Sequence, residues 1–352
     1  NSKTSYNGNY GLNASWTLYN GNKRLKTIQQ EKLNNQVAEL DVATSENNIQ
    51  ESIAQVYIQI LYAAESVKVN ESTLQVSIAQ RDRGQELLNA GSIAKSDFAQ
   101  LEAQVSTDRY QLVTAQATLE DYKLQLKQLL ELDGENEMNI YLPALSDENV
   151  LAPLPTKKDV YISALSLRPE IEASKLNVEA SELGIGIAKS SYLPTISLSA
   201  GIGTNHTSGS DFTFGEQVKN GWNNSIGLSV SVPIFNNRQT KSAVQKAKLQ
   251  YETSMLSLLD EQKTLYKTIE GLWLDANSAQ QRYAAANEKL KSTQISYELI
   301  SEQFNLGMKN TIELLTEKNN LLQAQQEQLQ AKYMAILNTQ LLKFYQGDKL
   351  AL

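Results

Sequence analysis

The feature that most constrains this chain is an internal duplication at a shift of 216 residues. At that shift residues 11–20 (GLNASWTLYN) fall on 227–236 (GLSVSVPIFN), and residues 88–91 (LNAG) fall on 304–307 (FNLG). Both matches share one register without an insertion between them. The chain is therefore predicted to contain two copies of one structural unit.

Each copy begins with a segment in which apolar and small polar residues alternate, the period of a strand with one apolar face. A third such segment, residues 195–202, precedes a polar stretch that contains His206. The intervening residues are uncharged Asn, Ser, Thr and Gly, which suits a wall between lipid and water; a half-buried sheet in a soluble protein is the alternative. The large apolar positions expected to face lipid are Tyr10, Leu12, Trp16, Leu18, Leu228, Val230, Val232 and Ile234.

The rest of each copy has helical spacing. Residues 1–142 and 234–352 contain no proline, so both stretches can hold very long helices. Between Phe98 and Leu129, the side chains spaced alternately three and four residues apart are all apolar except Asp108, which predicts a coiled-coil seam. A helix over residues 22–88 would extend ~100 Å.

Gly91 and Gly307 stand at matching positions between an outgoing and a returning helix. Glycine adopts the positive φ that closes a helix, and Ser96 or Thr311 can cap the next one. Each copy is thus a strand followed by a helical hairpin, and helix should account for roughly two-thirds of the residues, twice the usual share. Helices are expected near residues 22–88, 93–132, 167–190, 238–304 and 310–345, with an irregular link over 134–166.

Composition removes several classes of function. The formal net charge is -7, whereas nucleic-acid binding requires clustered Lys and Arg. The chain has no Cys, and its one histidine, His206, is expected in a solvated loop. No nucleophile with a base, phosphate-binding loop or metal-spaced cluster is present, so we expect no enzyme activity, no cofactor and no metal.

No run of about 18 apolar residues occurs, which excludes a transmembrane helix on length. The strands of a membrane-spanning barrel are too short to be excluded in this way. The alternating segments therefore leave a membrane location open.

Long helical hairpins attached to a few amphipathic strands resemble the TolC family of outer-membrane efflux proteins. A small sheet with exposed edges would be a poor fit to a soluble protein. The resemblance covers nearly the whole chain and includes both glycine tips. Its local matches are residues 167–171 (LRPEI) opening a helix, 192–194 (YLP) entering a strand, and 232–235 (VPIF) leaving one.

The resemblance implies a mainly α fold with a small antiparallel β part, in which coiled-coil hairpins form an α-barrel tunnel joined to β-barrel strands. In the family, three protomers each contribute four strands. This chain supplies three, and the counterpart of residues 167–203 in its first copy would lie before residue 1, so we expect it to lack the family's first strand and the preceding helices. The implied domains are residues 1–21 and 192–236 as outer-membrane β-barrel strands, 22–133 as the first periplasmic helical hairpin, 134–166 as an equatorial link, and 167–191 with 237–352 as the second periplasmic hairpin and a stacked helix.

The function implied is that of an outer-membrane exit duct of a tripartite efflux pump, which conducts small molecules passively across the periplasm and outer membrane of a Gram-negative bacterium. The implied partners are two further copies in a homotrimer, a periplasmic adaptor (membrane fusion) protein, an inner-membrane pump and outer-membrane lipid, with no nucleic acid. Two alternatives stay open: an exit duct for type I protein secretion, and a coiled-coil structural protein outside the membrane. The last would need charged residues on both sheet faces, which the strands lack.

The resemblance also implies roles for residues near the hairpin tips. Adaptor contact falls on Ala90, Gly91, Ser92, Ile93, Leu306, Gly307 and Met308, although a plain helix end explains these glycines equally well. An acidic periplasmic entrance falls on Glu313, Thr316 and Glu317, where Thr316 weakens the ring that the family builds from carboxylates. A polar gate link falls on Asp97 and Lys309, and Phe304 replaces a tyrosine of that closed network.

Overall fold

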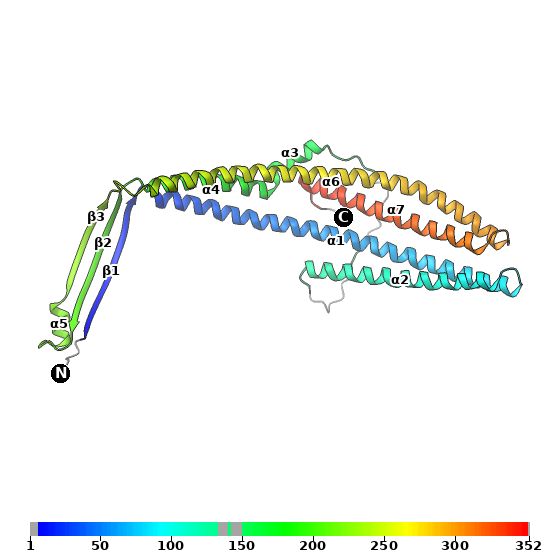
Figure 1. Ribbon diagram of the computed structural model, residues 1–352, viewed down its shortest axis with the longest axis horizontal. Helices are drawn as coiled ribbons and strands as arrows, with labels where there is room; N and C mark the ends of the chain where they lie inside the picture. Colours follow the sequence, from blue (N-terminus) through cyan, green and yellow to red (C-terminus); the bar gives the residue numbers. More distant parts are fainter. Residues whose placement is uncertain (1–5, 133–139, 142–149, 351–352) are drawn as a thin grey trace. The chain divides into compact units, whose positions relative to one another are not determined.

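The computed structural model describes residues 6–132, 140–141 and 150–350, and 74% of these are helical. Seven helices and three strands lie within these ranges (Figure 1). In chain order they are β1 (Asn7–Asn20), α1 (Lys23–Asn89), α2 (Lys95–Leu129), α3 (Lys157–Leu167), α4 (Pro169–Ser190), β2 (Thr195–Thr207), α5 (Phe214–Asn220), β3 (Asn223–Ser231), α6 (Gln239–Asn305) and α7 (Thr311–Gln346).

The predicted duplication is confirmed by the bounds of these elements. α1 and α6 are both 67 residues long, and β1, α1 and α2 begin 216 residues before β3, α6 and α7. The turn between strand and long helix repeats too: Gly21 and Asn22 have φ of 67° and 63°, and Asn237 and Arg238 have 50° and 62°. Left-handed backbone is uncommon outside glycine, so its recurrence at matching positions marks one local design used twice.

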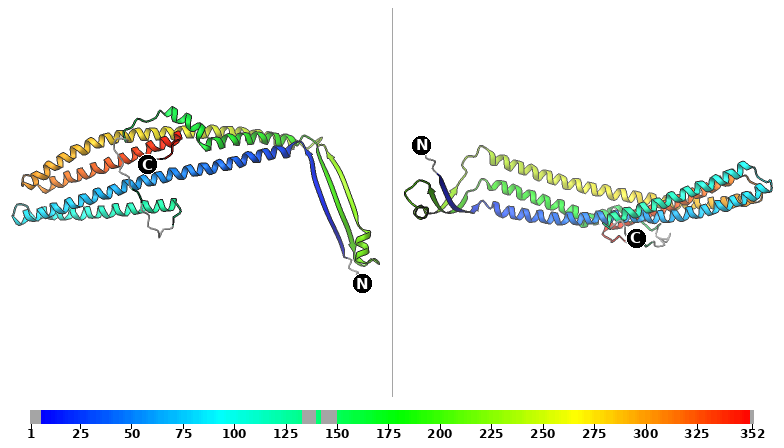
Figure 2. Two further views of the ribbon diagram at one scale, coloured as in Figure 1. Left: turned by 180° about the vertical axis from the view of Figure 1, so that it is seen from behind. Right: turned by 90° about the horizontal axis from the view of Figure 1, so that it is seen from below.

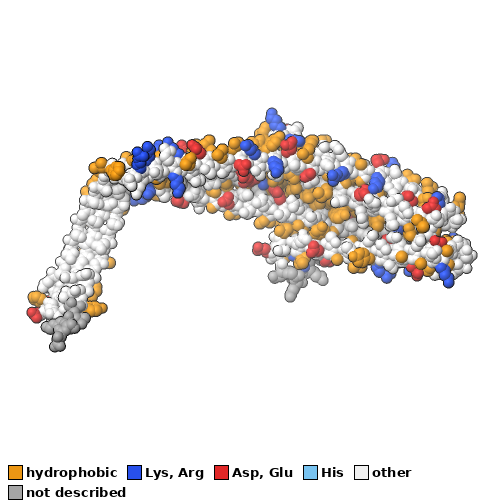
Figure 3. Space-filling view, in the orientation of Figure 1, with side chains coloured by type: hydrophobic (Ala, Val, Ile, Leu, Met, Phe, Trp, Pro, Cys, Tyr) orange, Lys and Arg blue, Asp and Glu red, His pale blue; other side chains and the backbone are white. Residues whose placement is uncertain are grey.

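The strands form one antiparallel sheet in the order β1-β2-β3. Directly opposed residues share a face, so the register divides the side chains into two sets. The face that carries Asn13, Ser199 and Ser229 is called the polar face. In Figure 3, the side of the sheet turned to the viewer shows no charged side chain between the strand ends. The apolar face carries Tyr10, Leu12, Ala14, Trp16, Ile196, Leu198, Ala200, Ile202, Ile226, Leu228 and Val230.

The predicted alternation is therefore confirmed, with two corrections at its margins. A bulge in β1 between Thr17 and Tyr19 brings Tyr19, not Leu18, opposite Ile196 on the apolar face. β3 ends at Ser231, so Val232 and Ile234 lie beyond it, next to Pro233, which has no N–H to donate to a neighbouring strand.

Neither face of this sheet is buried within the chain. Every residue of β3 is exposed, and Leu12 and Leu228 are 73% and 66% exposed. The three strands contain no Asp, Glu, Lys or Arg. Such a sheet depends on surroundings outside this chain to cover its apolar side chains.

Each of the two hairpins has its own tip (Figure 2), and the two tips are turns of the same type. At the first, the Gly91 N–H donates to the Leu88 carbonyl and the Ser92 N–H donates to the Leu87 carbonyl; at the second, the residues 216 further on make the same pair of bonds. This is the Schellman pattern, in which a glycine with positive φ satisfies the last carbonyls of a helix. Gly91 and Gly307 have φ of 72° and 74°, as predicted.

The caps that begin the returning helices differ from the prediction. α2 follows Ala94, whose N–H donates to Asp97, and α7 follows Asn310, whose Oδ1 accepts a bond from the Glu313 N–H at 2.9 Å. Ser96 and Thr311 already lie inside the helices as defined by these bonds. In both helices the first turn is held by bonds between the residue just before the helix and the residue three positions later, Ala94 with Asp97 and Asn310 with Glu313.

The chain divides into two compact units, residues 1–41 with 169–261 and residues 42–168 with 262–352. The first unit holds the sheet, α4 and α5. In the second, α7 supplies most of one apolar core, where its side chains Leu329, Tyr333, Leu337 and Leu341 pack on Ile58 of α1. The side chains of the α2 seam are buried or half-buried along its length, which confirms that prediction.

The structure differs from the expectations drawn from the sequence at two short helices, α3 and α5, and at His206. α3 occupies the end of the expected irregular link 134–166; Thr156 caps it by accepting the Asp159 N–H. Residues 133–139 and 142–149 of that link lie outside the described ranges. His206 is not in a solvated loop: it belongs to β2 opposite Gly8, and its ring packs on Phe214 of α5, because the strand continues through its polar end.

A first prediction concerns the closest approach inside the first hairpin. A Cβ added to Gly84 of α1 would collide with Leu101 of α2, which is 1% exposed and cannot turn to solvent. We expect Gly84→Ala to lower the free energy of unfolding by about 1–3 kcal/mol, as overpacking does. Gly271→Ala, in open space within α6, should instead raise it by up to ~1 kcal/mol. Urea unfolding followed by far-ultraviolet circular dichroism measures both; equal changes would contradict the close packing.

Candidate functional site

The tips of the two hairpins are exposed but chemically different. Around Gly91 the neighbours Ala90 and Ser92 are small, whereas Leu306 and Met308 on either side of Gly307 are 75% and 70% exposed. No atom lies within 4 Å of a Cβ built on either glycine, so the glycines are needed for backbone conformation and not for lack of space. The second tip therefore presents an apolar surface that the first does not.

Behind the second tip, the Glu313 carboxylate is held by two local bonds. Its Oε1 accepts from Lys309 Nζ at 2.5 Å, and its Oε2 accepts from the Asn310 N–H at 3.2 Å. The Lys309 hydrogen bond is the main reason that the pKa of the Glu313 carboxyl lies below its usual value, and the Asn310 backbone bond adds to it. Glu313 thus carries its negative charge even in mildly acidic solution.

Thr316 and Glu317, the other expected entrance residues, point to different partners. Thr316 is exposed, and its hydroxyl donates to the Ile312 carbonyl of its own helix at 2.8 Å. Glu317 accepts a bond from Ser296 of α6 at 3.0 Å. Of the three expected entrance residues, Glu317 thus bonds to α6, while Glu313 and Thr316 bond to residues of their own segment.

The structure does not bring the expected gate residues together within one chain. Lys309 pairs with Glu313, one turn along its own segment, and Asp97 caps α2 through the Ala94 N–H at 3.2 Å. Asp97 and Lys309 both remain partly exposed. A link between them is a matter for neighbouring chains and stays a prediction.

Phe304 lies in an apolar cluster that joins the hairpins near their tips. It is 2% exposed and packs with Leu101 of α2 and Leu314 of α7. A tyrosine hydroxyl at this position would lie in apolar surroundings without a partner. The phenylalanine that replaces the family's tyrosine therefore suits the packing around it.

Sequence reasoning missed a buried polar cluster that lies along the same helices. The Lys318 ammonium of α7 donates to the carboxylate of Asp108 in α2 and to the hydroxyl of Ser77 in α1, and all three residues are 3% exposed or less. Gln104 Nε2 donates to the other Asp108 oxygen at 2.9 Å. The one available signal was Asp108, the single polar residue in the α2 seam; its partner lies 210 residues away.

This cluster joins the first hairpin to the second with a charged pair inside the packed helices. Burial lowers the pKa of the Lys318 ammonium from its usual value, and the Asp108 carboxylate opposes that shift. A buried pair of this kind gives little net stability over an apolar pair, but either charge left alone is costly. The cluster therefore favours the one helix alignment in which both charges meet.

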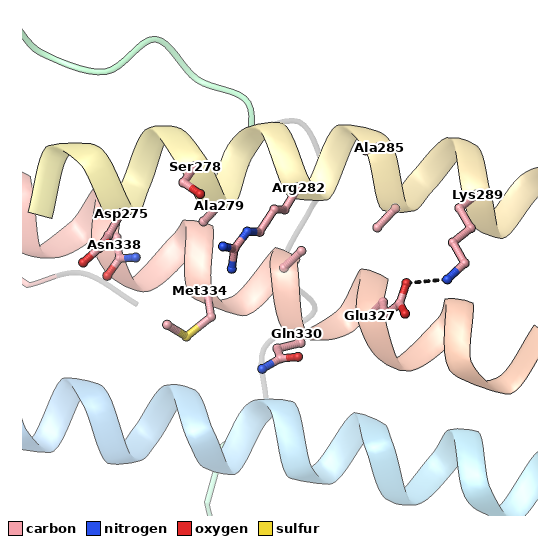
Figure 4. Close-up of a pocket in the computed structure, with 12 residues that line it drawn as sticks. Asp275, Ser278, Ala279, Arg282, Ala285, Lys289, Glu327, Gln330, Met334 and Asn338 are labelled. Atoms are coloured by element: carbon pink, nitrogen blue, oxygen red, sulfur yellow. Dashed lines mark hydrogen bonds and ion pairs between the residues drawn. The ribbon is translucent and has the colours of Figure 1, made fainter.

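A groove of about 560 Å³ runs between α6 and α7 (Figure 4). Alanines such as Ala279 and Ala285 line it, and the Lys289–Glu327 ion pair, 2.7 Å long, crosses one end. The described residues that line it include no His and no nucleophile beside a base. The groove offers shape and mixed charge.

Two further searches of the described residues bear on the chemistry. Within those residues, no group of three or more His, Cys, Asp or Glu side chains is arranged to hold a metal ion. None of the described helices combines the length and apolar character needed to cross a membrane.

Comparison with known proteins gives a family match over more than half of the chain. The sequence model of the family described as outer membrane efflux protein matches residues 160–347. The chain is 24% identical over 294 residues to outer membrane efflux protein BepC of Brucella suis, covering 83% of this chain and 61% of BepC. It is 23% identical over 311 residues to outer membrane protein TolC of Escherichia coli, covering 86% and 62%.

The fold has counterparts among solved structures. A crystal structure of CusC superposes with a TM-score of 0.83 at 18% identity, covering 98% of this chain and 83% of CusC. The chain spans about three-fifths of the length of the curated relatives it matches.

A second prediction tests the buried cluster. Asp108→Ala and Lys318→Ala should each lower the free energy of unfolding by about 3–5 kcal/mol, because each leaves a buried charge without its partner. Replacing both with apolar residues, Asp108→Leu with Lys318→Met, should recover most of that loss. Lys289→Ala, which breaks a pair that is over 40% exposed on each side, serves as the control and should cost only ~0–1 kcal/mol. If the double variant is as unstable as either single alanine variant, the pair is not the coupled unit described.

Proposed function

Because the chain belongs to the outer membrane efflux protein family, we propose that it is a protomer of an outer-membrane channel that conducts small molecules out of the cell. The observation that carries this proposal is the sheet, whose faces are apolar on one side and small and polar on the other, without a charged residue. Lipid on the apolar side and water on the polar side would satisfy both faces. Conduction is passive, the energy coming from an inner-membrane pump, and the chain is not an enzyme.

The proposed location is the outer membrane of a Gram-negative bacterium. Residues 1–21 and 192–236 would belong to the barrel wall, the helices of 22–133, 167–191 and 237–352 to a periplasmic tunnel, and 134–166 to the link between hairpins. A homotrimer would cover the sheet edges that β1 and β3 leave open within the described chain. The two helical hairpins per chain then become six around one axis.

The hairpin tips are the proposed contact with a periplasmic adaptor protein. Exposed Leu306 and Met308 would supply apolar contact, and the small side chains about Gly91 would permit close approach of the partner backbone. Apolar residues at an exposed turn suit a partner interface better than a free surface.

The proposed entrance is a ring of Glu313 carboxylates beside Thr316, one from each protomer. Glu313 stays ionised because Lys309 lowers its pKa, but the same lysine offsets part of its charge. Three such groups at close quarters would favour cations at the constriction. Glu317, bonded to Ser296, would support the ring from behind.

An exit duct for type I protein secretion is the alternative within the same class. Nothing in the described strands or tips separates the two, since the pump selects the cargo. Reconstitution with an efflux pump or with a secretion transporter, and measurement of which cargo leaves, distinguishes them.

A third prediction tests the assignment of the sheet faces. Leu228 and Ser229 are neighbours in β3 on opposite faces. Leu228→Arg should disfavour membrane insertion by ~2–4 kcal/mol, because it places a charge against lipid near the middle of the strand. Ser229→Arg should insert normally and change conductance. Folding yield into bilayers measures insertion, and single-channel recording measures conductance. If the two variants insert equally poorly, the assignment of Leu228 to the lipid face and Ser229 to the water face is wrong.

A fourth prediction concerns the gate. We propose that Lys309 exchanges its bond to Glu313 for one to Asp97 of a neighbouring protomer when the entrance closes. Lys309→Met should then raise the open probability in planar bilayers, and so should Asp97→Asn, which keeps an oxygen able to cap α2. The double variant should resemble either single one, because both break one interaction. Unchanged open probability in all three would leave the channel in place and remove this gate.

A further inference from the structure

The short helix α5, between β2 and β3, is held against the sheet by contacts from three side chains. The Phe214 ring meets Tyr10 edge-on, with centroids 6.4 Å apart, and lies tilted against His206 at 5.0 Å. Thr204 Oγ1 donates a hydrogen bond to the Val218 carbonyl at 2.8 Å. Phe214 and Val218 are one turn apart, so a single side of α5 makes these contacts.

The strand register decides which face of the sheet α5 covers. Tyr10 is opposite Thr204, and His206 is opposite Gly8. Opposed residues, and residues two apart along a strand, share a face, so all three contact residues belong to the face that carries Leu12. α5 therefore covers the end of the apolar face.

The surroundings of α5 are aromatic and carry little net charge. Phe212, Phe214 and Trp222 are 60%, 56% and 55% exposed. The charged residues of this segment, Asp211, Glu216 and Lys219, are all exposed and sum to one negative charge, so they form no basic patch that would attract an anionic surface. Aromatic rings with an apolar body concentrate at the boundary between lipid headgroups and acyl chains.

The length of the apolar face fits that boundary. Tyr10 stands near the α5 end of β1 and Tyr19 at the other, which corresponds to about 30 Å of strand. With the tilt of strands in membrane barrels, that length spans roughly the 25 Å apolar band of an outer membrane. α5 then lies where the band ends.

We propose that α5 is an interfacial helix that lies outside the sheet wall and inserts Phe212, Phe214 and Trp222 into the headgroup layer of the bilayer. The loop between β2 and β3 is thereby held away from the polar face, and it does not fold over the lumen as a lid. This inference rests on the proposed lipid contact of the apolar face. It adds the position of α5, which the alternation in the strands does not determine.

The chain has no cysteine, so single labels can be placed without removing any. Gly215 is suited to one, because a Cβ there meets no atom within 4 Å. Nitroxide labels on Gly215→Cys, Leu228→Cys and Ser229→Cys, each in the whole chain reconstituted in phospholipid vesicles, are compared by their collision rates with oxygen and with a water-soluble nickel chelate. Oxygen concentrates among acyl chains, and the chelate stays in water.

The ratio of oxygen to nickel collisions should be highest at position 228, lowest at 229 and intermediate at 215. Adding Phe214→Ala should release α5 and move the ratio at 215 towards that at 229, whereas the ratio at 228 should not change. A ratio at 215 equal to that at 229 before this change would overturn the interfacial position while leaving the membrane sheet intact. Equal ratios at 228 and 229 would remove the lipid contact itself and both proposals with it.

Discussion

The constraint on which the rest of this protein depends is that its sheet is a single layer, and beyond the end of the apolar face that α5 covers, the described residues bury neither of its faces. A soluble sheet buries one face on a second layer, and an apolar side chain gains roughly 1.5–3 kcal/mol from that burial. Here Leu12, Leu228 and their neighbours have no such layer, and the opposite face is lined with Asn, Ser and Gly. Contact with lipid on one face and water on the other would satisfy both, which supports the proposal that the strands form part of a wall. The long helices follow the strands through left-handed turns repeated at Gly21 and Asn237.

Helices of 67 residues raise a separate problem, since neighbouring helices with repetitive apolar seams can slip by a turn. Two devices in this chain oppose slippage. The Schellman turns set the length of each hairpin from its tip, and the Asp108–Lys318 pair allows only one alignment of α2 with α7 without an unpaired buried charge. Stability and alignment therefore come from different groups. The apolar seams stabilise the helices, and the buried polar cluster sets their alignment.

Much of this architecture was predictable from the sequence because its signals are local and repeated. Helix periodicity, glycine tips and the shift between copies predicted five helices to within a few residues, and the alternation predicted both faces of the sheet. What was missed depends on contacts between distant positions or on single bonds. The bulge at Leu18 has no composition signal, Lys318 finds Asp108 across 210 residues, and α5 with His206 forms a local cluster inside what reads as a polar loop. The gate link between Asp97 and Lys309, by contrast, was carried over from a resemblance, and the structure of one chain leaves it a prediction.

The residues proposed for the entrance and the gate already have bonding partners within a single chain, and this bears on how a gate between chains would behave. Lys309 has Glu313, Asp97 has the Ala94 N–H, and Glu317 has Ser296. A closed link must therefore exchange one exposed bond for another, and the difference between two such bonds is about 1 kcal/mol or less per chain. Summed over the three protomers of the proposed trimer, that difference shifts an equilibrium by at most roughly a hundredfold. A gate of this kind holds by a small margin, so a partner that binds the exposed Leu306 and Met308 of the tips needs only modest preference for the open state to reverse it.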